Sequence, residues 1–344
     1  MKKYFFIAKI YFLFFIAIFG WGKSFSQDPQ FSQFYANPLY LNPAMTGNTQ
    51  MGRLTANYRN QWAAVPASRS DAFKSYAFSY DHNLAAINSG LGIQFVRDRA
   101  GIGGLRYTDI AGLYAYHMTI NRNLHVNAGG RVSYSTRDID ISRLTFGDQL
   151  LRNDGSATTE SFVTEKVSFL DVGTGIIFYG PRFWAGTSFS HINRPDQTLM
   201  GNQALLPVKY SAHGGVNFPV KRNLKGTAVS SLTVAANYKG ELKWDQLDLG
   251  AYYKQSPVIF GLWYRGIPLI KSYKPGYLNN DAFILLAGFS FEDLGLSFGY
   301  SYDITISRLI KNTAGSHEVS LIYEFVTPDY KKSKRKFVIP CTKF

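Results

Sequence analysis

The sequence predicts an all-β protein, a transmembrane antiparallel β-barrel of about fourteen strands with an irregular N-terminal segment and a basic C-terminal tail. Three observations support this fold class. The chain begins with a charged and then apolar segment that is typical of exported proteins. It is 46% hydrophobic and 16% aromatic, yet beyond residue 26 it has no run of about 18 apolar residues that could form a transmembrane helix. Its apolar residues instead alternate with polar ones, as in strands with one lipid-facing side, and no segment has a convincing helical period.

The first 26 residues have the order of a secretory signal peptide. Met1-Lys2-Lys3 is positive, Tyr4 to Trp21 is almost wholly apolar, and Ser24-Phe25-Ser26 supplies small residues at the two positions that a signal peptidase reads. We expect cleavage near Gln27 and an integral location in the outer membrane of a Gram-negative bacterium. An uncleaved membrane anchor is the alternative, and the absence of a cysteine near the cleavage site argues against a lipoprotein.

Alternation assigns a direction to individual side chains. Over 53–62, Leu54 and Tyr58 share one face with Trp62, and Arg53 and Arg59 share the other. A basic side chain that faces lipid at the bilayer midplane costs about 2–4 kcal/mol, so we expect the polar face to line the lumen. The lumen residues predicted in this way are Arg53, Arg59, Gln61, Arg131, Lys209 and His213.

The same pattern recurs along the chain and gives about fourteen spans, an even number as is usual for single-chain bacterial barrels. Long polar or proline-bearing loops are expected at 138–165, 193–207 and 267–281, and short turns at 121–123 and 292–293. Six aromatic residues near segment ends are expected to form girdles at the membrane interfaces, namely Trp62, Tyr80, Tyr116, Tyr179, Trp244 and Trp263. The predicted spans are 53–62, 74–82, 90–97, 104–118, 124–136, 166–179, 182–192, 208–218, 230–239, 244–254, 257–265, 282–291, 296–302 and 319–325.

Two segments flank the barrel, which is expected to occupy 50–326. Residues 27–49 have no alternation and contain three prolines, so we expect them to lie in the periplasm or to fold into the barrel mouth as a plug. Residues 327–344 are expected to form a basic periplasmic tail, which holds about half of the net charge of +10 left without residues 1–26. We expect this tail to be solvated or to meet an acidic partner, and we expect no nucleic acid to bind. Its basic cluster is Lys331, Lys332, Lys334, Arg335 and Lys336.

Enzyme motifs are missing from the sequence, so we expect no catalytic residues, no cofactor and no metal site. There is no H-E-x-x-H, P-loop or paired-cysteine motif. Ser190, His191 and Asn193 could serve an outer-membrane hydrolase, but the first two are neighbours on a predicted strand and would face opposite sides. Four carboxylates that interrupt apolar runs are expected to pair with inward Arg and Lys rather than to hold a metal, namely Asp81, Asp98, Asp109 and Asp171.

Several short motifs together resemble the PorP/SprF family of the Bacteroidetes type IX secretion system. Asn42-Pro43-Ala44-Met45-Thr46-Gly47 matches an N-P-A-x-x-G element, and Tyr58-Arg59-Asn60-Gln61-Trp62 matches the Y-R-x-Q-W that follows it. The resemblance continues with Gly315-Ser316-His317-Glu318 and covers nearly all of the chain beyond the leader. Further matching blocks are 190–195, 262–265, 300–304 and the ending 340–344, where Thr342-Lys343 is looser than the usual pattern.

The resemblance implies a non-enzymatic outer-membrane barrel that supports secretion and gliding. Some members of the family are part of the core secretion and gliding apparatus, and others aid the secretion or surface attachment of one large adhesin. The implied partners are the C-terminal region of such an adhesin, type IX components and outer-membrane lipid. Asn42, Pro43, Ala44 and Gly47 are expected either to dock a partner or to plug the barrel, since Asn42-Pro43 favours an extended residue 42 and Gly47 permits a tight turn. A porin or uptake channel with a basic lumen is the alternative function.

Overall fold

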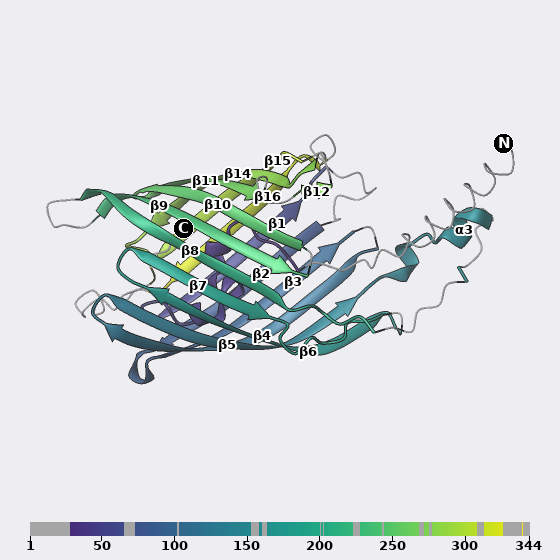
Figure 1. Ribbon diagram of the computed structural model, residues 1–344, viewed down its shortest axis with the longest axis horizontal. Helices are drawn as coiled ribbons and strands as arrows, with labels where there is room; N and C mark the ends of the chain where they lie inside the picture. The colour runs from purple at the N-terminus through teal and green to yellow at the C-terminus, as the bar shows by residue number, and fades with distance from the viewer. Residues whose placement is uncertain are drawn as a thin grey trace, which may run out of the picture. The chain divides into compact units, whose positions relative to one another are not determined.

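The computed structural model describes residues 28–64, 73–101, 103–152, 158–159, 164–199, 201, 203–222, 228–242, 244–267, 272–274, 277–307, 313–325 and 339. Within these residues, fourteen antiparallel strands form a closed barrel (Figure 1). Each strand pairs with its neighbour along the chain, and β1 closes the ring by pairing with β16. The predicted fold class and the predicted number of spans are therefore confirmed.

The fourteen strands coincide with the fourteen predicted spans to within a few residues at each end. Alternation succeeds here because each strand has one face against lipid and one against the lumen, so the side-chain period of two is visible in the sequence. The barrel strands are β1 Gly52–Gln61, β2 Phe73–Leu84, β3 Ser89–Ala100, β4 Leu105–Asn121, β5 Leu124–Asp138, β6 Lys166–Tyr179, β7 Phe183–Ser190, β8 Lys209–Arg222, β9 Ala228–Glu241, β10 Trp244–Gln255, β11 Val258–Gly266, β14 Asn280–Phe291, β15 Leu296–Thr305 and β16 Ser316–Glu324.

Connections of different length lie at the two ends of the barrel. At one end, here called the turn end, β4 joins β5 and β14 joins β15 through short turns. At the other, the loop end, lie the three predicted long connections, between β5 and β6, between β7 and β8, and between β11 and β14. The long connections contain the short elements η4 Ile141–Arg143, α3 Gly147–Arg152, β12 Ser272–Lys274 and β13 Tyr277–Leu278; another, η3 Ala85–Ile87, lies in the β2–β3 turn. Such barrels place short turns in the periplasm and longer loops outside.

The outer wall is apolar over most of its height. In β1 the side chain of Leu54 is 44% exposed, whereas that of its neighbour Arg53 is buried on the lumen side. Tyr116 and Trp244 are exposed near strand ends, as expected for girdle residues. Tyr179 and Trp263 are 4% and 1% exposed, so their assignment to a girdle was wrong: both point into the lumen. None of the helices among the described residues is long and apolar enough to cross a bilayer.

Strand β7 is shorter than predicted and ends at Ser190. His191 follows with a φ of 59°, so it leaves the strand rather than facing the side opposite to Ser190. Beyond it, the Ile192 N–H donates to the carbonyl of Val172, and the Asn193 side chain accepts from the Val172 N–H and donates to the Leu170 carbonyl. The Asn193 amide thus makes two hydrogen bonds to the β6 backbone beyond the end of β7.

Candidate functional site

Residues 31–49 lie inside the barrel and are called the lumen plug below. Every residue from Phe31 to Thr49 is buried except Tyr40, which is half-buried. The plug contains three short helices, η1 Phe34–Ala36, α2 Pro38–Leu41 and η2 Pro43–Met45. Strands β4, β5 and β6 contact η2 directly, and β16 contacts η1, so the plug reaches across the lumen.

Local chemistry determines the shape of the plug. Pro38 and Pro43 each begin a helix, where the missing N–H of proline has no cost. Asn42 has φ −158° and ψ 120° and its side chain accepts from the Ala44 N–H, so it caps η2 from an extended conformation. Gly47 has a φ of +69°, a conformation that side chains other than glycine rarely adopt. The extended residue 42 and the tight turn at Gly47 were both predicted from the sequence and are confirmed.

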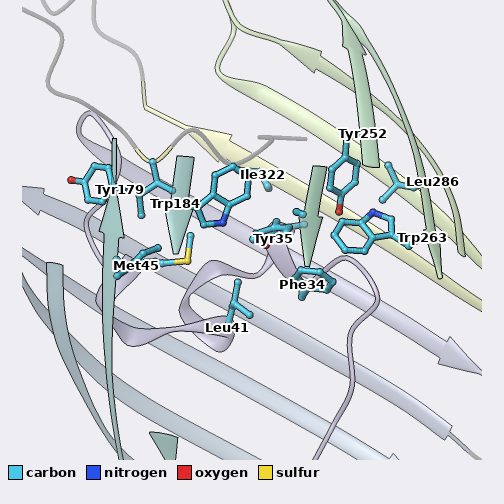
Figure 2. Close-up of a cluster of buried hydrophobic side chains, with 14 of the residues drawn as sticks. Phe34, Tyr35, Leu41, Met45, Tyr179, Trp184, Tyr252, Trp263, Leu286 and Ile322 are labelled. Atoms are coloured by element: carbon cyan, nitrogen blue, oxygen red, sulfur yellow. The ribbon is translucent and has the colours of Figure 1, made fainter. Parts of the chain in front are cut away.

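The plug packs its aromatic residues against aromatic residues of the barrel wall. Figure 2 shows Phe34 and Tyr35 beside Trp263 and Trp184. The Phe34 and Trp263 rings lie edge to face at 4.9 Å between centroids, and the Tyr35 and Trp184 rings do so at 5.6 Å. Edge-to-face pairs of this kind are worth about 0.5–1.5 kcal/mol beyond the area they bury. The lumen therefore has an apolar core at this level, and Trp263 faces inward because the plug supplies its partner.

A buried group of charges, here called the charge hub, fixes the start of the plug to the wall. It consists of Ser32 from the plug and of Arg59, Arg265, Asp303 and Glu318 from β1, β11, β15 and β16. Arg59 pairs with Asp303 at 2.8 Å and with Glu318 at 3.2 Å, and Arg265 pairs with Asp303 at 3.1 Å. The Ser32 N–H donates to the Glu318 carboxylate, and the Ser32 hydroxyl donates to Asp303, both at 2.6 Å.

Gln33 extends the hub with four hydrogen bonds. Its N–H donates to the Glu318 carboxylate at 3.0 Å, and its amide donates to the Glu318 carbonyl and to the Ser301 hydroxyl. The Ser320 hydroxyl in turn donates to the Gln33 amide oxygen at 2.6 Å. Because buried polar groups are costly unless they are hydrogen-bonded, these contacts favour one fixed position of the plug.

The N-P-A-x-x-G turn is held by a second set of polar contacts. The Asn42 amide lies 3.1 Å from the His213 ring and donates to the carbonyls of Ile176 and Thr187. The Gly47 N–H donates to Asp81, which also pairs with Arg53 at 2.8 Å. Pro43 and Ala44 are buried in the same turn. In this structure the four residues expected either to dock a partner or to plug the barrel make their contacts with the barrel wall, so docking there would require the plug to leave the lumen.

The inward carboxylates are paired. Besides Asp81, Asp109 pairs with Arg131, and Asp171 pairs with Arg131 at 3.4 Å and with the His191 ring at 3.0 Å. Asp98 accepts a hydrogen bond from Ser75. The described residues contain no group of three or more His, Cys, Asp or Glu that could hold a metal ion. His191 thus contacts a carboxylate, while Asn193 contacts the β6 backbone, and the two do not converge on Ser190 as a hydrolase would require.

The remaining predicted site residues fall into two groups. Lys209 points into the lumen, with its ammonium 5.2 Å from the Tyr40 ring of the plug, and Gln61 is half-buried on the lumen side at the loop end. The basic cluster 331–336 lies outside the described residues. Near the end of the chain, Ile339 is 2% exposed and belongs to the same apolar cluster as Phe34 and Trp263.

Glycines in the wall create the space that the turn of the plug occupies, a role that the sequence analysis missed. A Cβ at Gly90 would overlap the carbonyl of Thr46, one at Gly129 that of Pro43, and one at Gly175 the side chain of Asn42. Glycine inside a strand often marks a close approach of another backbone, and this signal was present in the sequence.

Gly129→Ala should push the turn out of its seat, because the added methyl meets backbone rather than a flexible side chain. Overpacking of this kind typically costs about 1–3 kcal/mol, so the exposure of the plug should rise roughly tenfold. The measurement is the maleimide labelling rate of Met45→Cys in a Cys341→Ser background. Gly112→Ala is the matched control, since a Cβ there meets no atom within 4 Å. Equal labelling rates in the two variants would contradict the packing argument.

The longest loop, between β5 and β6, has an ordered contact of its own. Asp148 accepts from the Thr159 N–H at 2.8 Å and pairs with Arg152 at 2.7 Å. Hydrogen bonding from the Thr159 backbone lowers the pKa of Asp148 to about 2. The carboxylate therefore stays ionised at any physiological pH and keeps these contacts.

Fold and site together define a membrane-spanning β-barrel whose lumen is occupied by its own N-terminal segment. The chain belongs to the PorP/SprF family, described as type IX secretion system membrane proteins, whose family profile matches residues 23–323. The family predicted from the motifs at 42–47, 58–62 and 315–318 is confirmed. The protein is thus an outer-membrane β-barrel of the type IX secretion system.

Similar solved structures include several outer-membrane proteins. Omp33 of Acinetobacter baumannii is 7% identical with a TM-score of 0.43, covering 81% of this chain and 100% of that one. CymD, a monoaromatic hydrocarbon channel, is 13% identical with a TM-score of 0.47 over 84% of this chain and 93% of that one. A FadL homologue of Pseudomonas aeruginosa is 12% identical with a TM-score of 0.41 over 80% and 90%. No curated protein sequence matches the chain.

Proposed function

We propose that this protein is a plugged, non-enzymatic accessory barrel of the type IX secretion and gliding system, which supports the secretion and surface attachment of a large adhesin-type partner. The observation that carries the proposal is the buried lumen plug, in which Asn42 and Ala44 have no exposed surface. A barrel filled in this way is suited to docking rather than to conduction. The porin alternative, by contrast, requires an aqueous path through the same space.

The partner is expected to bind outside the lumen. Barrels of 16–18 strands leave an aqueous channel, and one of fourteen is too narrow for a folded protein even without a plug. We propose that the adhesin contacts the long connections at the loop end, 139–165, 191–208 and 267–279, because they are the longest segments between barrel strands. The basic tail, with Lys331, Lys332, Lys334, Arg335 and Lys336, is proposed to meet an acidic component of the secretion machine.

A mild-detergent pull-down of the tagged protein from native outer membranes tests this function. We expect a very large surface protein among the partners identified by mass spectrometry, and we expect replacement of residues 141–152 by a short Gly-Ser linker to reduce its recovery. Neutralising the five basic tail residues should leave the adhesin bound and remove periplasmic components instead. Recovery of machine components alone would make the protein a core part of the apparatus. A barrel that is recovered without any partner would overturn the proposal in favour of a channel.

A further inference from the structure

The outer wall changes from apolar to basic in one small region near the loop end. The strand register aligns Phe78 of β2 with Phe95 of β3 and Ile110 of β4 in one outward row. Phe78 and Ile110 are each 50% exposed, as expected for side chains that face lipid. One row closer to the loop end, the register aligns Tyr76 with Arg97 and Thr108. Polar and aromatic side chains begin there, as they do at a membrane interface.

Four basic side chains gather at this level on three neighbouring strands, and they are called the basic patch below. Arg97 is exposed in the row of Tyr76, and in the next row the register aligns Lys74 with Arg99 and Arg106. Neighbouring strands lie about 4.8 Å apart, so the Cα atoms of Lys74 and Arg106 are separated by roughly 10 Å. All four side chains lie on the same outward face of their strands as the lipid-facing residues.

Basic side chains outnumber carboxylates at this level among the described residues. On β2 to β5 the one described carboxylate on the outer face at this level is Asp138, which pairs with Arg106. Asp98 belongs to the lumen face, where it accepts from Ser75. Beyond Asp138 the same row continues to the exposed Lys166 of β6. In the other direction it continues through Asn60, His317 and Tyr302, none of which is Arg or Lys.

We propose that the basic patch binds the phosphate groups of an acylated outer-leaflet lipid, whose chains lie along Phe78, Phe95 and Ile110. Arg side chains bind phosphate through paired hydrogen bonds, and basic residues at a membrane surface attract anionic headgroups. The row beneath the patch is apolar, with Phe78 and Ile110 exposed and Phe95 half-buried, so a ligand with both phosphate and hydrocarbon matches the surface. A soluble acidic protein would match the charges alone.

Native mass spectrometry of the full-length barrel in detergent, with lipid A carrying two phosphates as the probe, tests the proposal. We expect the variant with Lys74, Arg97, Arg99 and Arg106 all changed to Gln to bind at least about tenfold more weakly. Arg182→Gln with Lys221→Gln is the matched control, because it removes two exposed cations at the turn end. This control should bind as the wild type does.

The chemistry of the probe separates a phosphate site from general lipid adhesion. Dephosphorylated lipid A with the same acyl chains should bind the wild type and the fourfold variant equally weakly. Equal binding of the two lipids by the wild type, or an equal loss in the control variant, would overturn the proposal. If the fourfold variant does not fold, Arg97→Gln alone should still weaken binding by roughly threefold to fivefold. Wild-type binding by that single variant would then overturn the proposal as well.

Discussion

Deleting residues 31–47 should convert a barrel with no resolvable conductance into a stable open pore. The deleted segment includes the aromatic core around Phe34 and Tyr35 and both polar attachment points, Ser32 and Asn42. Once it is gone, the inward Arg side chains and the carboxylates that pair with them would line an open passage. The measurement is the single-channel current of purified protein in planar bilayers, with the reversal potential in a salt gradient as the readout of selectivity.

The matched control removes a segment of similar kind from outside the barrel. Replacement of residues 141–152 by a Gly-Ser linker should leave the protein closed, since this loop has no buried residues in η4 or α3. Heat-modifiable migration on gels verifies that each variant is folded. If the plug-deletion variant is folded but carries no measurable current, the polar network of the wall closes the lumen without the plug. A wild-type barrel that conducts would contradict the occluded lumen itself.

Arg59→Ala should have the largest effect of any single substitution that we consider. It removes the cation that lies between Asp303 and Glu318, whose side chains are 3% and 0% exposed, and so leaves two buried carboxylates with less compensation. Removal of one partner from a buried ion pair typically lowers the free energy of unfolding by about 3–5 kcal/mol. Denaturant unfolding in detergent micelles, followed by tryptophan fluorescence, measures this loss.

Two further variants separate the ion-pair effect from a general loss of packing. Arg152→Ala removes an exposed loop cation paired with Asp148 and should leave unfolding within experimental error of the wild type. Adding Asp303→Asn and Glu318→Gln to Arg59→Ala should restore part of the lost stability, because the two carboxylates that Arg59 compensated are then neutral and Arg265 keeps Asp248 as its partner at 2.8 Å. If the triple variant is less stable than Arg59→Ala alone, the hub stabilises the barrel through hydrogen-bond geometry rather than through charge balance.

The strands could be predicted from the sequence because their cause is local. Each span needs only a lipid-facing and a lumen-facing side, and both are visible in any stretch of about ten residues. The conformations of Asn42 and Gly47 were predictable for the same reason, since proline and glycine restrict or widen φ and ψ at short range. The end of β7 was missed although Ser190 and His191 are two polar residues in succession, because the turn at His191 depends on a positive φ that a non-glycine residue does not reveal in the sequence.

The contents of the lumen could not be predicted in this way. The rule that polar residues face inward fails at Ile177, Trp184 and Trp263, which are buried on the lumen side because they pack against the plug. The contact between the plug and the wall joins residues far apart in the chain, so no short segment of the sequence contains both partners. Alternation along the strand correctly predicted that Arg59 faces the lumen. Its partners Asp303 and Glu318 come from the last two strands, and only the structure identifies them.

The charge hub also has a consequence for the order of assembly. The hydrogen bond from Ser32 to Glu318 joins residues 286 positions apart, and Arg59 and Glu318 lie on the two strands that meet where the barrel closes. Contacts of such long sequence separation form late and slowly. Because the plug lies near the start of the chain, its hydrogen bonds to Asp303 and Glu318 cannot form before β15 and β16 are present. A chain truncated before Asp303 would lack both carboxylates that pair with Arg59, whereas Arg265 would keep Asp248 as its partner at 2.8 Å. An incomplete barrel of this kind would therefore contain an Arg59 without its carboxylate partners.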